Sequence, residues 1–390
     1  MADARSSEIV VIGAGIAGAG AGFYLANAGY KVTLIEREHP ASGPTGRSSA
    51  LLHVFYLMPE LQQLAARGID ILRQIPELTG QTAGFSQIGN LWAAGPNTEN
   101  EFRDAVGHIQ ETLPDIEIEI LGLDDLKTMA PDFNWDGIEM AVWEPTCGYA
   151  DSYSAANALV TGARDRGADI RLNTRVSKLA VEGGRIAGVE TDGGEKIAAD
   201  IVIAATGVWT KPLIAQTGVD LPLTVERHCM AVLDAPNFAR RTMPFCWVDD
   251  VFMNYGRPDG TGVILLGSWA GGGTGVRHDE SGRGNLIDEP EGYEEGVATD
   301  EAVPIVESFL SRIPALEKLG IRPGYAGLYD MSPDDNPIID AVPGAEGLFV
   351  VCGSSGHGFK MGAGVGEAAA KMATEGKPAV LAPFTIERFS

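Results

Sequence analysis

The sequence predicts an α/β (α+β) protein in which a Rossmann-like dinucleotide-binding domain is joined to a domain built on an antiparallel sheet. Two observations lead to this prediction: a βαβ pattern with a glycine motif begins the chain, and short strand-like runs follow between about residues 179 and 267. With 390 residues, 45% of them apolar, the chain is long enough for two such units.

The first unit is EIVVIGAGIAGAGAGFYLANAGYKVTLIERE, with an apolar strand at residues 9–12, a small-residue helix to about residue 28 and a strand at 31–36. Gly13, Gly15 and Gly18 form GxGxxG, which allows a tight turn, close approach of backbone to a pyrophosphate, and close helix packing. The pyrophosphate would meet the helix N-terminus. Glu36 ends the second strand, where its carboxylate can bind a ribose diol and would repel the 2′-phosphate of NADP.

Later elements follow from periodicity and turn residues. Helices are predicted at 60–74, 101–112 and 154–166, and a strand at 170–172. Gly-Gly pairs at 183–184 and 193–194 separate three short strands that lead into an apolar strand at 200–205. Strand-like runs between about residues 221 and 267 predict an antiparallel sheet, and the glycine- and acid-rich residues 271–300 predict a mobile loop. A strand is predicted at 348–352 and a helix at 361–374.

Composition excludes several classes of function. A formal net charge of -24 argues against nucleic acid or an anionic membrane surface as the main partner. Four scattered cysteines without a CxxC pair predict neither a disulfide framework nor a metal site, and fit a reducing cytoplasm. The sequence shows no export signal and no integral membrane segment, so a cytoplasmic location is expected.

Three separated motifs together resemble the D-amino-acid oxidase-like (DAO) family of FAD-dependent oxidoreductases, which includes sarcosine oxidase, glycine oxidase and D-amino-acid dehydrogenases. They are the βαβ unit, the meander that ends in DIVIAATGVW, and the C-terminal PIID…GLFVVCGSSGHGFK. The resemblance spans the whole chain and implies FAD as the cofactor. It also implies a discontinuous FAD-binding domain of residues 1–80, 146–215 and 322–390, with a substrate-binding domain of 81–145 and 216–321.

The resemblance places two further segments against the flavin. The glycine-rich loop at 353–358 would bring backbone amides and a helix N-terminus to the ring, where reduced flavin carries negative charge. The stretch SGPTGRSSALLHVFY is similar to the flavin-contacting segment of amino-acid dehydrogenases. The residues expected to bind FAD are Gly13, Gly15, Ile16, Ala17, Gly18, Glu36, Arg37, Gly46, Arg47, Ser48, Ser49, Val176, Ala205, Gly207, Trp209, Gly353, Gly356, His357, Gly358, Phe359 and Lys360.

The activity that the resemblance implies is oxidation of the C–N bond of a small amino acid or N-alkyl amino acid. Hydride transfer to flavin N5 would give an imine that hydrolyses. Lys360 matches the position that holds the substrate carboxylate in sarcosine-oxidase-like proteins, and Arg227 matches a substrate-binding arginine of D-arginine-dehydrogenase-like proteins. Tyr56 and Tyr255 match pocket tyrosines, while His53 stands where sarcosine oxidase has a pocket arginine.

Two departures from sarcosine oxidase affect the expected chemistry. Gly327 occupies the place of the cysteine that attaches flavin, so FAD should be non-covalent. Leu265 occupies the place of the lysine that activates oxygen, which favours a quinone or dye over O2 as the electron acceptor. The alternatives are a flavin hydroxylase, an FAD-dependent 2-hydroxy-acid dehydrogenase, and a flavin-binding protein without amino-acid turnover.

Overall fold

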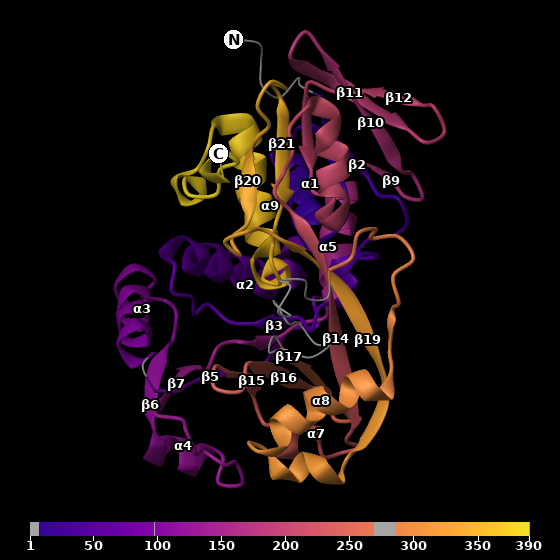
Figure 1. Cartoon of the computed structure of the whole chain (residues 1–390). Helices are drawn as coiled ribbons and strands as arrows, with labels where there is room; N and C mark the ends of the chain where they lie inside the picture. The colour runs from indigo at the N-terminus through magenta and orange to yellow at the C-terminus, as the bar shows by residue number, and fades with distance from the viewer. Residues whose placement is uncertain (1–7, 97, 269–285, 390) are drawn as a thin grey trace.

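A computed structural model describes residues 8–96, 98–268 and 286–389, and two large sheets organise them (Figure 1). The first has six strands, parallel except for the antiparallel pair β20 and β21. Its order is β20 (Ile338–Ala341), β21 (Leu348–Cys352), β13 (Ile201–Ala204), β1 (Glu8–Ile12), β2 (Lys31–Ile35) and β9 (Asp169–Arg171).

The side chains of β1 alternate between two hydrophobic cores, as the period of two along a strand requires. Ile9 and Val11 pack in the core of the helical face, and Val10 and Ile12 pack in the core on the meander side. The helices are α1 (Ile16–Asn27), α2 (Pro59–Thr79), α5 (Ser152–Asp165) and α9 (Gly358–Glu375), and the meander consists of β10 (Val176–Glu182), β11 (Arg185–Thr191) and β12 (Lys196–Ala198).

The second large sheet has nine strands and lies in the lower half of Figure 1. Neighbouring strands are antiparallel except for the parallel pair β15 and β5. Its order is β18 (Gly296–Val297), β19 (Gly320–Met331), β14 (Thr224–Asp234), β17 (Val263–Ser268), β16 (Asn254–Asp259), β15 (Cys246–Asp249), β5 (Asn90–Ala94), β7 (Met140–Glu144) and β6 (Glu119–Gly122).

Shorter elements complete the fold. A small sheet joins the two halves through β3 (Leu51–Leu52), β8 (Gly148–Tyr149) and β4 (Ser86–Gln87). The remaining helices are α3 (Glu99–Thr112), α4 (Leu123–Met129), α6 (Thr210–Ile214), α7 (Ala239–Thr242) and α8 (Thr299–Leu310). Within the described ranges no helix has the length and hydropathy of a membrane span.

Most predicted elements are present, and the differences have physical causes. The predicted helix at 60–74 continues to Thr79 through Pro76, because α2 packs against α5 and α9 and this contact outweighs the boundary that proline favours. Residues 271–285 of the predicted loop at 271–300 lie outside the described residues. Its described end contains β18 and the first residues of α8.

Candidate active site

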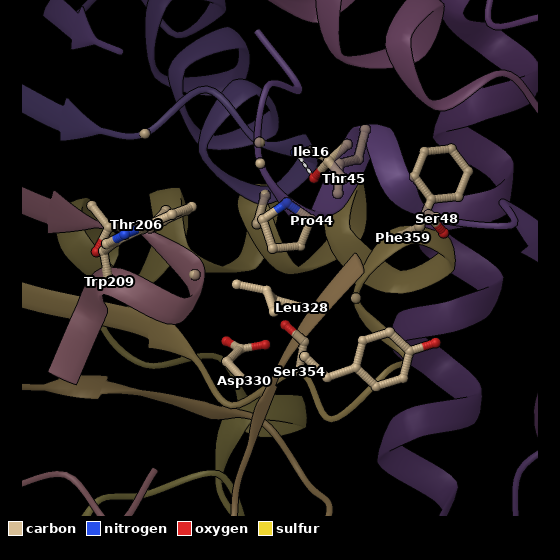
Figure 2. A pocket seen from close by; sticks show the side chains of 18 of the residues that line it. Ile16, Pro44, Thr45, Ser48, Thr206, Trp209, Leu328, Asp330, Ser354 and Phe359 are labelled. Atoms are coloured by element: carbon tan, nitrogen blue, oxygen red, sulfur yellow. Dashed lines mark hydrogen bonds between the residues drawn. The ribbon is translucent and has the colours of Figure 1, made fainter. Parts of the chain in front are cut away.

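A cavity of about 710 Å³ lies between the two large sheets and receives side chains from both. Thr206 and Trp209 stand at one end, and Ser48 and Phe359 at the other (Figure 2). This volume is typical of a small-molecule or cofactor site. The cavity is long enough to contact both the glycine motif of β1–α1 and the N-terminus of α9.

The glycine motif forms the first wall of the cavity. Gly13 has a φ of +99°, which a side chain would strain, and a Cβ on Gly18 would overlap the Gly13 carbonyl oxygen. Among the described residues, a Cβ on Gly15 would meet only Thr45 Oγ1, at 3.1 Å. Thr45 Oγ1 also accepts the Ile16 N–H at 3.1 Å, a bond drawn in Figure 2. Gly13 and Gly18 therefore serve packing, while Gly15 keeps backbone open toward the cavity, as a pyrophosphate site requires.

Glu36 is buried at the end of β2 and lines the same cavity. Its carboxylate accepts the Ala14 N–H at 2.8 Å and the Glu38 N–H at 3.0 Å. These two backbone bonds fix the carboxylate beside the glycine turn, where a ribose diol would lie.

Arg37 and Trp209 close this end of the cavity. The Arg37 guanidinium lies 3.8 Å from the Trp209 ring centroid. Glu291, from the segment that follows the undescribed residues, accepts from Trp209 Nε1 at 2.6 Å and from Arg37 Nη1 at 3.1 Å. Three segments distant in sequence thus meet over the expected adenosine end.

The loop before α9 is held by a buried carboxylate that sequence reasoning missed. Asp330 on β19 accepts the Gly353 N–H at 2.7 Å and also binds the Ser354 amide, and burial raises its pKa to about 6. Gly356 has a φ of +85°, and a Cβ there would lie 2.6 Å from the Tyr329 ring. The cavity is reached by Ser354, Ser355 and Gly356, whereas Gly353 lies behind them.

A cluster of polar side chains occupies the opposite end. Lys360, on the first turn of α9, is only 8% exposed and lines the cavity, with Nζ 5.8 Å from the Tyr56 ring centroid. The Tyr56 hydroxyl lies 3.0 Å from His357 Nδ1. His53 packs between Tyr56 and Trp92, with ring centroids 4.9 and 5.0 Å away.

Burial governs the protonation of this cluster. It lowers the pKa of Lys360 to about 8, while the negative charge of Glu144 acts in the opposite direction. Burial also lowers the pKa of His53 well below its ordinary value, and the charges of Lys360 and His357 lower it further. At neutral pH the cavity therefore holds a protonated lysine beside a neutral histidine.

The nine-stranded sheet supplies the floor. Tyr255 and Tyr329 line the cavity and their hydroxyls are 3.3 Å apart. The His228 ring stacks on Tyr329 at 3.9 Å, and its Nε2 lies 3.1 Å from Glu226 Oε2. The sequence analysis predicted Tyr255 as a site residue but missed Tyr329, His228 and Glu226.

The predicted place of Arg227 in the substrate pocket needs correction, because its side chain does not reach the cavity. Its guanidinium donates to Glu301 at 2.6 Å and to the carbonyl oxygens of Glu294 and Gly296. Successive side chains of a strand point to opposite faces, so Glu226 and His228 face the cavity and Arg227 faces α8. The period of two along this strand was the signal that could have separated them.

Other predicted residues also lie outside the cavity wall. Tyr56 stands behind His357, and Arg47 points away to pair with Glu295 at 2.6 Å. A Cβ on Gly46 would overlap the Ala41 carbonyl oxygen, which gives this glycine a packing role. The remaining predicted residues do line it: His53, Tyr255, Gly13, Gly15, Ile16, Ala17, Glu36, Arg37, Ser48, Ser49, Val176, Ala205, Gly207, Trp209, Gly356, His357, Gly358, Phe359 and Lys360.

Comparisons with known proteins agree with this geometry. The model of the DAO family, described as FAD dependent oxidoreductase, matches residues 8–372. Human mitochondrial sarcosine dehydrogenase is 28% identical over 382 residues, which cover 96% of this chain but only 40% of that protein. The N-methyl-L-tryptophan oxidase of Yersinia pestis is 27% identical over 98% of this chain and 99% of its own length. The crystal structure of L-proline dehydrogenase from P. horikoshii superposes with a TM-score of 0.85 and 26% identity over 99% of this chain and 98% of that one.

Proposed function

Because the chain belongs to the DAO family of FAD-dependent oxidoreductases, we propose that it oxidises the C–N bond of a small amino acid or N-alkyl amino acid. The proposal rests on the position of Lys360, a buried cation that lines the same cavity as the dinucleotide motif. An ammonium in a partly dry cavity is suited to a carboxylate, and a charge-assisted hydrogen bond there is strong.

The names of the relatives support a substrate with a secondary amine. Those proteins are named for sarcosine, N-methyl-L-tryptophan and L-proline, each of which has a secondary amine next to a carboxylate. The chain spans about 40% of the length of the sarcosine dehydrogenases, so the activity of that whole protein is not transferred to it.

The cavity fits FAD at both ends. Open backbone at Gly15 and the carboxylate of Glu36 would hold the pyrophosphate and ribose, and the loop at 354–358 would face the ring. Bound FAD would supply the two-electron oxidation, and water would hydrolyse the resulting imine. Lys360 would orient the substrate through its carboxylate, and Tyr56 would hold His357 in place.

We also propose that FAD is bound without a covalent bond. A Cβ at Gly327 would lie 2.9 Å from Arg47 Cβ, so a side chain at the position of the attaching cysteine would collide with another segment of this chain. Acid precipitation should release intact yellow FAD. Colour that stays with the precipitate would contradict non-covalent binding.

The domain division is a further part of the proposal. FAD would be held by residues 1–80, 146–215 and a C-terminal segment, and substrate by 81–145 and 216–321. The six-stranded sheet and the nine-stranded sheet support this division. The boundary at residue 322 lies inside β19, which pairs with β14, so the C-terminal segment is better begun after Met331.

Anaerobic bleaching of the flavin tests the function. Glycine, sarcosine, L-proline, D-proline and N-methylated amino acids should be compared with 2-hydroxy acids in the absence of oxygen. Bleaching by amino acids is expected. Bleaching by hydroxy acids alone would favour a 2-hydroxy-acid dehydrogenase, and no bleaching would favour a flavin-binding protein without amino-acid turnover.

A further inference from the structure

Glu144, the last residue of β7, is a fully buried carboxylate beside the polar end of the cavity. It does not line the cavity itself, and neither the sequence motifs nor the proposed chemistry uses it. A buried carboxylate is costly unless its surroundings compensate for the lost hydration. Its contacts therefore need an explanation.

Four donors converge on this carboxylate. Oε1 accepts the N–H groups of Val54 at 2.6 Å and Phe55 at 3.1 Å, and the Cys147 thiol lies 3.6 Å away. Oε2 accepts Asn90 Nδ2 at 3.3 Å. Donor groups on every side favour the ionised form, although burial raises the pKa of Glu144 to about 7.

The two backbone donors define what Glu144 positions. Val54 and Phe55 lie between His53 and Tyr56, in the irregular segment that joins β3 to α2. Their N–H groups are tied to β7 of the nine-stranded sheet, and the His53 ring is tied to the same segment through the Phe55 carbonyl oxygen, 3.0 Å from Nδ1. Glu144 thus fixes the turn that presents His53 to the cavity and Tyr56 to His357.

No cationic side chain of the described residues lies at ion-pair distance from Glu144. None of the ion pairs in the described part of the chain includes it. Glu144 accepts the Phe55 N–H, and the ring centroid of the next residue, Tyr56, lies 5.8 Å from Lys360 Nζ. The charge of Glu144 raises the pKa of Lys360 against the effect of burial. Lys360 also faces His53, His357 and the Tyr56 phenol, and the carboxylates of Glu226 and Asp250 line the same cavity from the nine-stranded sheet.

We propose that Glu144 is a positioning residue of the substrate site, whose carboxylate fixes the His53–Tyr56 turn and whose buried charge balances the Lys360 ammonium. The inference rests on the proposed function, because it assigns to Lys360 the binding of a substrate carboxylate. It goes further by naming the group that keeps this lysine charged in a dry cavity.

Glu144→Gln removes the charge and keeps the shape. The Gln oxygen can accept the Val54 and Phe55 amides, and its NH2 group would face Asn90. The Asn90 Oδ1 atom is buried and has no hydrogen-bond partner among the described residues, so the Asn90 amide can turn over and accept from the new donor. The variant should therefore fold and bind FAD.

The test measures binding of simple carboxylates, acetate and benzoate, to oxidised holoenzyme by the change in flavin absorption. In the wild-type protein affinity should fall as pH rises through the Lys360 pKa of about 8. In E144Q the midpoint of this loss should move about one pH unit lower, because a buried negative charge no longer favours the protonated lysine. A merely structural role would weaken binding without moving the midpoint.

Matched variants separate the outcomes. Glu119→Gln removes an exposed acid of the neighbouring strand β6 and should leave the midpoint unchanged. Asn90→Leu removes the donor to Oε2, favours the protonated form of Glu144 and should move the midpoint in the same direction as E144Q, even if E144Q itself folds poorly.

Failure of the inference can be told from failure of the proposed function. If carboxylates bind, Lys360→Met abolishes the binding, and both E144Q and N90L keep the wild-type midpoint, then the role of Glu144 is wrong and the carboxylate site stands. If Lys360→Met binds carboxylates as well as the wild type does, the carboxylate site and the inference both fall.

Discussion

At the residue scale, Lys360 shows how burial tunes one side chain without removing its charge. The first turn of α9 carries it into the cavity, where lost hydration lowers its pKa from the ordinary 10.5 to about 8. The ammonium form still predominates at neutral pH. An ammonium that is poorly hydrated before substrate arrives loses less hydration on binding a carboxylate.

Lys360→Met should raise the KM for carboxylate substrates about tenfold to a hundredfold, because a charge-assisted contact in a dry site contributes roughly 1.5 to 3 kcal/mol. FAD content should change far less than the KM. In the wild-type enzyme the low KM should be present below about pH 8 and lost above it, since the lysine must be protonated. Steady-state kinetics across this pH range check both statements. An unchanged KM in the variant would show that Lys360 does not bind substrate.

At the scale of elements, the turn between β1 and α1 separates two uses of glycine. Gly18→Ala should destabilise the protein because the added Cβ would overlap the Gly13 carbonyl oxygen. Gly15→Leu should fold, since Thr45 Oγ1 is the one atom of the described chain near the new Cβ. It should be colourless because the side chain fills the pyrophosphate approach. Thermal unfolding and flavin absorbance measure the two effects. A yellow Gly15→Leu protein would contradict the assignment.

The segment 286–297 is a second element with a testable role, because it crosses the expected adenosine end. Glu291 binds Trp209 and Arg37, and Arg227 of β14 binds the carbonyl oxygens of residues 294 and 296. These contacts connect the nine-stranded sheet to the cofactor cavity.

Glu291→Gln should accelerate FAD release several-fold, because it weakens two charge-assisted contacts that close the cavity. Stopped-flow flavin fluorescence after dilution into a flavin-scavenging apoprotein measures the rate. The exposed neighbour Glu289 provides a matched Glu→Gln control. Equal release rates in wild type and Glu291→Gln would mean that the segment does not retain the cofactor.

At the scale of the whole molecule, two sheets enclose one cavity, and a strand behind its wall bears on the electron acceptor. Leu265 packs among Met230, Val232 and Tyr255. Its cross-strand neighbour Arg257 donates to Asp259 and to the Ser49 carbonyl oxygen. Leu265 lies behind Tyr255, which lines the cavity, so this strand brings no cation to the position where the resemblance to sarcosine oxidase expects a lysine.

Reduced enzyme should therefore pass electrons to a quinone or dye faster than to O2, because the first electron transfer to oxygen produces an anion that a nearby cation would stabilise. Rapid mixing of anaerobically reduced enzyme with aerated buffer, and in parallel with a dye, measures the two rates. Leu265→Lys should increase the oxygen rate. Reoxidation in air as fast as reduction by substrate would identify an oxidase.

The sequence by itself determined the features that depend on residues close together in the chain. The glycine turn, the following helix and Glu36 lie within one βαβ unit, so spacing alone predicted them. The strand at 348–352 and the existence of the helix after it were likewise readable from a short stretch with a marked composition, although the helix begins at Gly358 and not at the predicted residue 361. Each depends on neighbours a few residues away.

Only the tertiary structure decided which side chains meet. Strand alternation turned Arg227 away and brought His228 to the cavity, and the packing of β7 against the β3–α2 turn placed Glu144 beside His53. Asp330 and Glu291 gained their roles from partners that lie 23 and 82 residues away. A buried polar group is stabilised by whichever donors the folded chain brings to it, and that geometry is set by sheet register and layer packing rather than by local pattern.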